Sequence, residues 1–397
     1  MAKKNTTRRE QGSGTIRKKT VTRKGKPYEY WEARVTIGRD PGTGKQIQKS
    51  FSGKTQKEVR EKMRLAAGEV DTDTYQEPNK MTLSEWLDIW EADYLSDIKP
   101  FTRASYHTQV VNHIVPSLGA VKLQALKAPQ IQKFYNSLAK GDKPLSAKTI
   151  KNIHGVLHRA LKQAVDIGYI RFNPSDAVTL PRVEHKEIQP LDDDQMKVFL
   201  EAIKGHRFEL LYTVTLFTGM REGEVLGLKW ENIDFQNGMI HIKEQLQREK
   251  KKNGQYVFAS LKNGKPRTIT PAGKVMNLLR RQKREQALAH LKAGQHWQES
   301  GLVFTNELGQ HLTAVTVYND LKKIAVEIGM PDLRFHDLRH SYAVAAIRAG
   351  DDWKTISGNL GHATTAFTID KYGHFTKHMK RDSSERMNDF MEAVLGL

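Results

Sequence analysis

Alternation of apolar and polar residues marks the first predicted element of the chain. The stretch "EYWEARVTIG" has the period of a strand with one buried face, and its apolar positions are Trp31, Ala33, Val35 and Ile37. The neighbouring runs "GTIRKKTVTR" and "QIQKSF" predict two more strands, and "TQKEVREKMRLAAGEV" has the spacing of a helix with an apolar stripe. Residues 1–72 are therefore expected to form a small α+β unit with a three-stranded sheet.

Helical spacing dominates the next hundred residues. A capping box, Thr82 with Glu85 three positions later, opens the segment. Apolar residues then recur every three to four positions, as in the series Ile150, Ile153, Leu157, Leu161 and Ala164. The polar stretches "DTYQEPNK" and "NPSDAVTLPRVEHKEIQP" on either side are typical of linkers. This pattern predicts an all-α domain over residues 82–180.

The remainder, residues 190–397, mixes helices and strands. "LYTVTLFTGMREGEVLGL" predicts two helices joined at Thr218–Gly219, and helices resume near residue 271 and continue to the end. Between them, "GMIHIKEQL", "QYVFASL" and "PRTIT" predict three strands. The Asn263-Gly264 pair between the last two strands favours a tight hairpin. We expect a mixed α/β, mainly helical domain here.

Composition narrows the classes of function. The chain has no cysteine, which excludes disulfides, thiolate nucleophiles and cysteine-based zinc sites. No run approaches the length of a membrane span, and the basic N-terminus lacks the apolar core of a secretory signal, so we expect a cytoplasmic protein without membrane contact. The net charge is +19, and residues 1–60 hold 17 Lys and Arg against 5 Asp and Glu. This excess, part of it on a basic arm expected to be disordered at residues 1–12, indicates a polyanionic partner.

The segment "FHDLRHSYA" concentrates titratable side chains. His336 and His340 are spaced to share a helix face. A zinc enzyme of the H-E-x-x-H type would carry Glu where Asp337 stands, and no matching ligand set occurs elsewhere, so no metal is expected. Phosphate fits better. Arg339, and Arg221 in "TGMRE", lie beside predicted helix starts, where a guanidinium fork and the helix dipole both favour an anion.

Taken in order, these residues resemble the catalytic domain of tyrosine site-specific recombinases, the lambda-integrase family. The first family box, T-G-x-R-x-x-E-x-x-x-L, is matched by "TGMREGEVLGL", and the second, H-x-L-R-H, by "HDLRH". L-G-H follows at Leu360–His362, and Tyr372 stands ten residues after His362. The resemblance covers residues 190–385. The outer regions resemble a helical core-binding domain and the basic arm-binding domain of integrases from conjugative transposons and integrative conjugative elements.

The resemblance implies roles around the phosphate. Charge builds on the non-bridging oxygens in the transition state, and each donor aimed at them is worth on the order of 3 kcal/mol. The implied donors are Arg221, Arg339 and His362. His336 would orient the phosphate or share a proton. Tyr372 would be the nucleophile, giving a 3′-phosphotyrosine and a free 5′-hydroxyl.

Four further residues receive implied supporting roles. Lys262 on the predicted hairpin would be the general acid for the leaving oxygen, with Lys265 as the competing choice. Glu224, one helical turn from Arg221, would hold it or a neighbour in place. His340 is expected to be a structural hydrogen-bonding residue. Neither a metal nor a nucleotide cofactor is implied, because the phosphotyrosine conserves the bond energy.

The resemblance implies DNA contacts on the N-terminal sheet, whose polar face would enter the major groove. The candidate residues are Arg17, Lys19, Tyr30 and Arg34. The expected partners are double-stranded DNA at element ends and target sites, further copies of the chain in a tetramer, and an excisionase-type directionality factor. The tail at residues 383–397 has one apolar stripe: Met387, Phe390, Met391 and Val394. The stripe would pack on the chain's own catalytic domain or, as the resemblance implies, dock on a neighbouring protomer as an exchange helix.

These features predict a site-specific recombinase that integrates and excises a mobile genetic element. Two alternatives use the same domains. A type IB topoisomerase-like enzyme would relax supercoils without strand exchange, although the basic N-terminal unit argues against it. A non-catalytic DNA-binding regulator would not be expected to keep the complete Arg/Lys/His/Arg/His/Tyr set.

Overall fold

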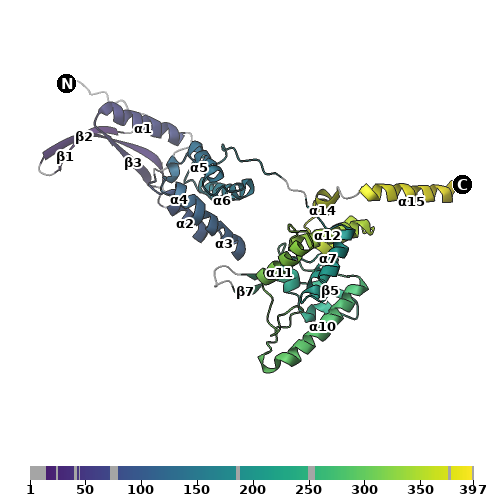
Figure 1. The fold of residues 1–397 in the computed structure, drawn as a ribbon. Coiled ribbons are helices and arrows are strands. Elements are labelled where there is room, and N and C mark those ends of the chain that lie inside the picture. The colour runs from purple at the N-terminus through teal and green to yellow at the C-terminus, as the bar shows by residue number, and fades with distance from the viewer. Residues whose placement is uncertain are drawn as a thin grey trace, which may run out of the picture. The chain divides into compact units, whose positions relative to one another are not determined.

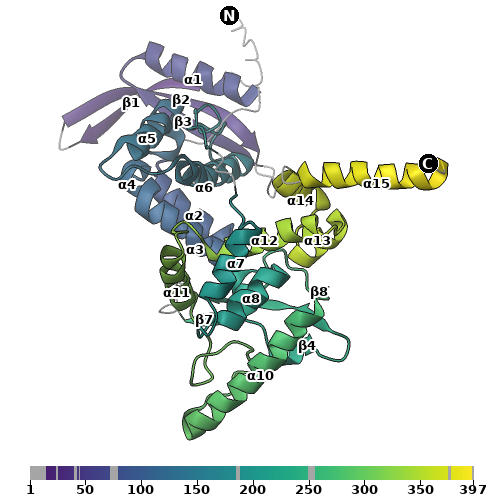
Figure 2. The same cartoon turned by 45° about the vertical axis from the view of Figure 1, so that its right-hand side comes forward.

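The structure is a computed structural model that describes residues 15–23, 26–39, 43, 45–71, 79–184, 188–248, 255–373 and 377–395. The chain forms two compact units, Met1–Glu184 and His185–Leu397, and Figures 1 and 2 show their elements from two sides. The basic arm predicted at residues 1–12 lies outside the described residues. The division into three domains at the predicted boundaries stays a prediction.

Three antiparallel strands and a helix form the N-terminal part of the first unit, as the alternating pattern predicts. The strands pair in the order β1-β2-β3, and the elements are β1 (Thr15–Arg23), β2 (Lys26–Arg39), β3 (Gln46–Gly53) and α1 (Gln56–Asp71). Helix α1 covers one face of the sheet (Figure 1). Ala33, Val35 and Val59 are buried on that side, so the opposite face of β2 is the polar one.

The helical pattern of the second region is also correct. Its elements are α2 (Leu83–Asp93), α3 (Pro100–Gln109), the π-helical turn η1 (Val110–Ile114), α4 (Val115–Leu118), the 3₁₀ turn η2 (Leu123–Ala125), α5 (Ala128–Lys140) and α6 (Ala147–Asp166). The predicted capping box opens α2, since the side chains of Thr82 and Glu85 each accept from the other's backbone N–H. Trp86 and Trp90 are fully buried in this helical core.

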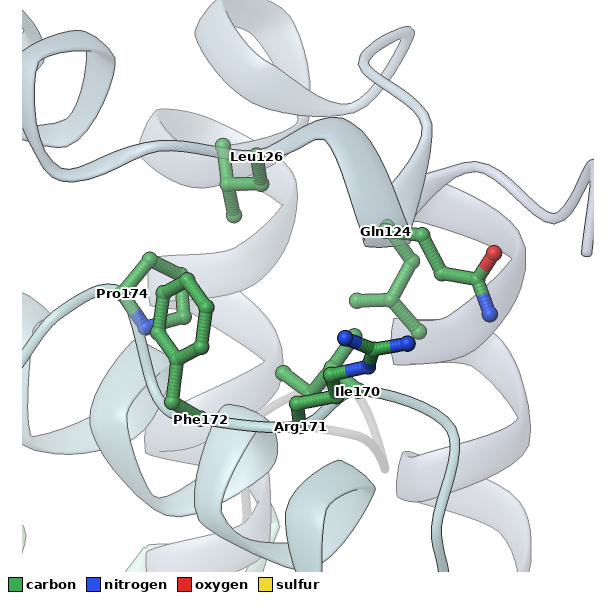
Figure 3. A pocket seen from close by; sticks show the side chains of 7 residues that line it. Gln124, Leu126, Ile170, Arg171, Phe172 and Pro174 are labelled. Carbon is green, nitrogen blue, oxygen red and sulfur yellow. The ribbon is translucent and has the colours of Figure 1, made fainter. Parts of the chain in front are cut away.

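A pocket opens in this helical region (Figure 3), far in sequence from the predicted catalytic residues. Buried Leu123, Leu126 and Ile170 contribute apolar side chains, and Phe172 is largely exposed. None of the residues expected to take part in catalysis lines it.

The second unit combines helices with two small antiparallel sheets. Its helical elements are α7 (Asp193–Ala202), α8 (Glu209–Thr218), α9 (Glu222–Leu226), η3 (Trp230–Asn232), α10 (Gly273–Ala293), η4 (Gly294–His296), α11 (Ala314–Glu327), α12 (Phe335–Arg348), α13 (Trp353–Leu360), α14 (Thr365–Tyr372) and α15 (Lys377–Leu395). One sheet has the order β4-β5-β8 and the other is β6-β7. The strands are β4 (Ile233–Asp234), β5 (Met239–Ile242), β6 (Glu244–Arg248), β7 (Tyr256–Ser260) and β8 (Arg267–Ile269).

The predicted hairpin at Asn263-Gly264 is wrong in its pairing. A turn forms there, because Gly264 has a φ of +68° and its N–H donates to the Leu261 carbonyl at 2.9 Å. However, β7 pairs with β6 and β8 pairs with β5. Pro266, next to β8, has no N–H to donate to a ladder, and buried Ile269 aligns with Ile240 of β5. The turn that carries Lys262 therefore joins two sheets. The run "GMIHIKEQL" likewise splits at Lys243 into β5 and β6.

Candidate active site

Arg221 stands at the N-cap of α9 because the chain turns sharply after α8. The turn is made by Gly219, whose φ of +64° is a left-handed conformation that favours glycine, and a Cβ there would collide with the ring of Tyr342. The backbone N–H of Arg221 donates to Glu224 Oε2 at 2.9 Å and its Nη1 donates to Oε1 at 2.8 Å. Glu224 thus makes the contact expected of it.

Glu224 is shared with a second arginine that the sequence reasoning missed. Arg267 of β8 donates to Glu224 from Nη1 at 3.0 Å and from Nη2 at 2.6 Å, and its Nε donates to the Asn359 carbonyl at 2.8 Å. Burial of Glu224 opposes ionisation, yet the hydrogen bonds and charge of Arg267 and Arg221 lower its pKa to about 2. The sequence did contain a signal for Arg267. It stands two positions before Ile269, so on a strand its side chain points to the same face as this buried residue.

Arg339 is buried, and its guanidinium converges with that of Arg221 on one chain segment. Nη1 of Arg339 donates to the Gly219 carbonyl at 2.7 Å and Nη2 to the Leu360 carbonyl at 2.6 Å. Nη2 of Arg221 donates to the next carbonyl, that of Gly361, at 3.2 Å. One expectation is corrected here. Because α12 begins at Phe335, Arg339 lies in its second turn, beyond the reach of the terminal dipole.

Tyr372 is the last residue of α14 and is fully buried. Its hydroxyl lies 2.7 Å from Nδ1 of His340, and its ring stacks on that of His362 with a centroid distance of 6.3 Å. Burial raises the pKa of Tyr372 to about 12 and lowers the pKa of His340 to about 3. The expected hydrogen-bonding role of His340 is therefore directed at the predicted nucleophile, with both groups neutral near pH 7.

The other two histidines lie on either side of this pair. His336 is exposed one helical turn before His340, with 4.7 Å between ring centroids. His362 follows α13, and its Nδ1 lies 2.8 Å from the Thr368 hydroxyl. Burial and the charges of Arg339 and Arg221 lower the pKa of His362 to about 3.

The turn that carries Lys262 lies against the end of α13. The side-chain amide of Asn263 donates to the Gly361 carbonyl at 3.0 Å. Lys371, which precedes the predicted nucleophile, was not singled out from the sequence. Burial and then the charges of Arg339 and Lys262 lower the pKa of Lys371. The charge of Lys262 thus acts on Lys371 beside the predicted nucleophile, whereas Lys265 follows the turn.

The predicted DNA-contacting residues share the exposed face of the N-terminal sheet. The strand register places Arg17 opposite Glu32 and Lys19 opposite Tyr30. Glu32 was not predicted, and its carboxylate organises the face. Nη2 of Arg17 donates to it at 2.8 Å and Nζ of Lys19 at 2.9 Å, while Nε of Arg34 lies 3.6 Å away. Hydrogen bonds from Lys19 and Arg17 hold the pKa of Glu32 below its usual value.

The described ranges lack both a metal-binding cluster and a membrane-spanning helix. No group of three or more His, Asp or Glu side chains among those residues is arranged to hold a metal ion. In the same residues, no helix combines the length and apolar character needed to cross a membrane.

Comparisons with known proteins match the chain to one family. The model of the phage integrase family matches residues 189–379, and that of the phage integrase N-terminal SAM-like domain matches residues 82–139. A tyrosine recombinase XerC-like protein of Caldanaerobacter subterraneus subsp. tengcongensis is 33% identical over 91% of this chain and 96% of its own length. The ICEBs1 integrase of Bacillus subtilis strain 168 is 26% identical over 91% and 97%.

Two solved structures share the fold. The Tn1549 transposon integrase in complex with transposon right end DNA has a TM-score of 0.66 at 22% identity, covering 78% of this chain and all of that one. A lambda integrase dimer bound to a COC′ core site has a TM-score of 0.53 at 18% identity, covering 92% and 96%. The chain therefore belongs to the phage integrase family of tyrosine recombinases, enzymes that cleave and rejoin DNA in the site-specific integration and excision of mobile elements.

Proposed function

We propose that this recombinase acts through Tyr372 and a phosphate site built from Arg221, Arg339 and His362. The observation that carries the proposal is the convergence of both guanidinium groups on the Leu360 and Gly361 carbonyls, directly before His362. These carbonyls occupy donors that would otherwise face the non-bridging oxygens of a scissile phosphate. Removing one such donor typically costs about 10²–10³ in rate.

The contact between His362 and Thr368 supports the role of His362 as a third donor. If the Thr368 hydroxyl donates to Nδ1, the ring proton resides on Nε2 and is free to bind a phosphate oxygen. The low pKa of His362 keeps the ring neutral, so it would act as a hydrogen-bond donor rather than as a charge.

The reaction proceeds in two balanced steps. The Tyr372 oxygen attacks phosphorus, the bond from phosphorus to O5′ breaks, and Nζ of Lys262 gives its proton to O5′. The phenol proton passes to an imidazole, for which exposed His336 is the candidate. In the second step a 5′-hydroxyl of another strand attacks the 3′-phosphotyrosine and gives its proton to Nζ of Lys262. The bond from phosphorus to the Tyr372 oxygen breaks, and His336 returns the phenol proton to that oxygen.

The assembly we propose is a tetramer on paired DNA sites. The apolar stripe of α15 supports it, since these four side chains are between 49% and 64% exposed: Met387, Phe390, Met391 and Val394. Such a stripe favours docking on a neighbouring protomer. The lambda integrase has been solved as a tetramer bound to a Holliday junction. A cytoplasmic location fits this function, because the DNA substrate of a mobile element lies in the cytoplasm. An excisionase-type directionality factor would be a further partner.

One experiment tests the proposal against both alternatives. Full-length protein is incubated with supercoiled DNA that carries the two element ends, and samples are quenched with detergent. The proposed function gives a covalent protein–DNA adduct together with recombinant product. A topoisomerase would give an adduct and relaxed DNA without recombinants, and a regulator would give no adduct.

A further inference from the structure

The turn that carries Lys262 is fastened at three points. Leu261, just before it, is buried in the main core of the unit. Arg267, just after it, is bound to Glu224 and to the Asn359 carbonyl. Between these two ends, the Asn263 amide reaches across 98 positions of sequence to the Gly361 carbonyl. The hydrogen bond of Asn263 therefore fixes the position of the middle of the turn.

The acceptor chosen by Asn263 belongs to the phosphate site. The Gly361 carbonyl also accepts from Nη2 of Arg221, and the next residue is His362. Gly361 ends α13 with a φ of +62°, and a Cβ there would contact the guanidinium of Arg267 at 2.9 Å. Arg221 and Arg267 thus restrain the position of Gly361, and a hydrogen bond to its carbonyl restrains the turn as well.

A lysine on an exposed turn needs such a restraint to act as a general acid. Lys262 and Asn263 are both exposed. The four-carbon stem of a lysine is flexible, and this conformational freedom makes proton transfer to one defined oxygen less favourable. Fixing the backbone next to Lys262 limits the volume that Nζ samples. Gly264, with its left-handed φ, lets the chain turn back immediately after Asn263.

We propose that Asn263 is a positioning residue that docks the turn on Gly361 and so aims Lys262 at the leaving 5′-oxygen. The proposal rests on the function proposed above. It requires a donor at position 263, because a carboxylate there would face a carbonyl oxygen and repel it. The role of Asn263 differs from that of Arg267, because Arg267 also binds Glu224, which in turn binds Arg221.

A bridging sulfur tests this role selectively. A duplex is prepared with either the ordinary phosphodiester or a 5′-bridging phosphorothiolate at the cleavage position, because a thiolate leaves without needing a proton. Full-length Asn263→Ala and Asn263→Asp are expected to cleave the ordinary duplex roughly 10- to 100-fold more slowly than wild type. On the phosphorothiolate both should recover to within a few-fold, and Lys262→Ala should show the same recovery.

Two control variants define the outcome. Asn237→Ala alters another asparagine that precedes a left-handed glycine, in the turn from β4 to β5, and should behave as wild type on both duplexes. Arg267→Gln should be slow on both, because it also releases Glu224. Wild-type rates for Asn263→Ala on the ordinary duplex, or a defect that the sulfur does not relieve, would overturn the proposal. Lack of recovery by Lys262→Ala would instead remove Lys262 as the general acid, and the positioning role with it.

Discussion

The Tyr372 hydroxyl lies 2.7 Å from Nδ1 of His340, and both side chains are buried. A fully buried hydroxyl is inaccessible to the phosphate of a DNA duplex. For Tyr372 to act as the proposed nucleophile, α14, which ends at this residue, must move and break this hydrogen bond. In this structure the proposed nucleophile is therefore held in an unreactive position.

Replacing the nucleophile tests the assignment of Tyr372 directly. Tyr372→Phe should bind core-site DNA with unchanged affinity and form no covalent adduct, because only the hydroxyl is lost. The lost bond to His340 should also lower the free energy of unfolding by about 1 kcal/mol. Gel shifts, detergent-quenched adduct assays and melting curves measure the three quantities. Adduct at the wild-type level would show that another residue attacks.

The Tyr372–His340 pair also predicts a pH dependence of stability. The pKa of His340 is about 3 in the folded chain against 6.5 when unfolded. Below pH 6.5 the unfolded chain takes up a proton that the folded chain does not, so stability falls by up to about 1.4 kcal/mol per pH unit between pH 6.5 and pH 3. His340→Gln removes this contribution. Its melting temperature should decline less steeply than that of wild type over pH 6.5 to 4, and parallel curves would refute the assignment.

Glu224 should matter for folding and for catalysis at once. Glu224→Gln leaves the guanidinium groups of Arg221 and Arg267 without their buried anion, which should cost about 3 kcal/mol of stability and slow single-turnover cleavage. Arg221→Lys keeps a charge beside Glu224 but loses the bidentate fork. It should melt near the wild-type temperature and cleave roughly 10²-fold more slowly. If both variants cleaved normally, neither residue would belong to the active site.

The N-terminal sheet should contribute salt-dependent binding to separate DNA. Deleting residues 1–72 is expected to leave core-site cleavage intact and to impair recombination of full-length ends. Within the sheet, Arg17→Ala should reduce the salt dependence of binding by about one phosphate contact. Lys18→Ala is the matched control, because Lys18 lies one position along β1 and points to the other face. Equal effects of the two substitutions would contradict a DNA-binding face.

Removal of the part of α15 that carries the apolar stripe distinguishes docking on a neighbouring protomer from packing within the chain. Because the apolar stripe of α15 is exposed, truncation after Asp382 should leave the melting temperature and single-site binding unchanged. Cooperative binding to DNA with paired sites should weaken. A gel-shift titration on two-site DNA, with a melting curve in parallel, gives both results. A large drop in melting temperature with cooperativity intact would mean that the helix packs on its own protomer.

Sequence periodicity predicted those elements that depend on local order. The alternation around Ala33 and Val35 and the capping box at Thr82 needed only neighbours within a few positions. Strand pairing around Asn263-Gly264 was misjudged because β8 aligns with β5, whose Ile240 is almost thirty residues away from Ile269 in the chain. A turn dipeptide determines the turn, whereas packing in the core determines which strands pair.

The candidate site shows the same division. The order of short motifs selected Arg221, Arg339 and Tyr372, because each motif is contiguous. The partners of these side chains come from distant segments, as with Arg267, which reaches Glu224 from 43 positions away. The sequence showed Glu32 as a polar residue of the strand, but its hydrogen bond with Arg17 depends on the register between β1 and β2. Such contacts follow from tertiary packing rather than from local spacing.

The backbone carbonyls of Gly219, Leu360 and Gly361 have one more consequence, which concerns competition by small anions. They already accept from Nη2 of Arg221 and from Nη1 and Nη2 of Arg339, so an inorganic phosphate that takes over these donors only exchanges one hydrogen bond for another. A phosphate within DNA is held in place by contacts elsewhere on the duplex, and it can displace the carbonyls without losing further freedom of its own. The proposed site should therefore bind a diester that is part of a polymer in preference to a free phosphate ion.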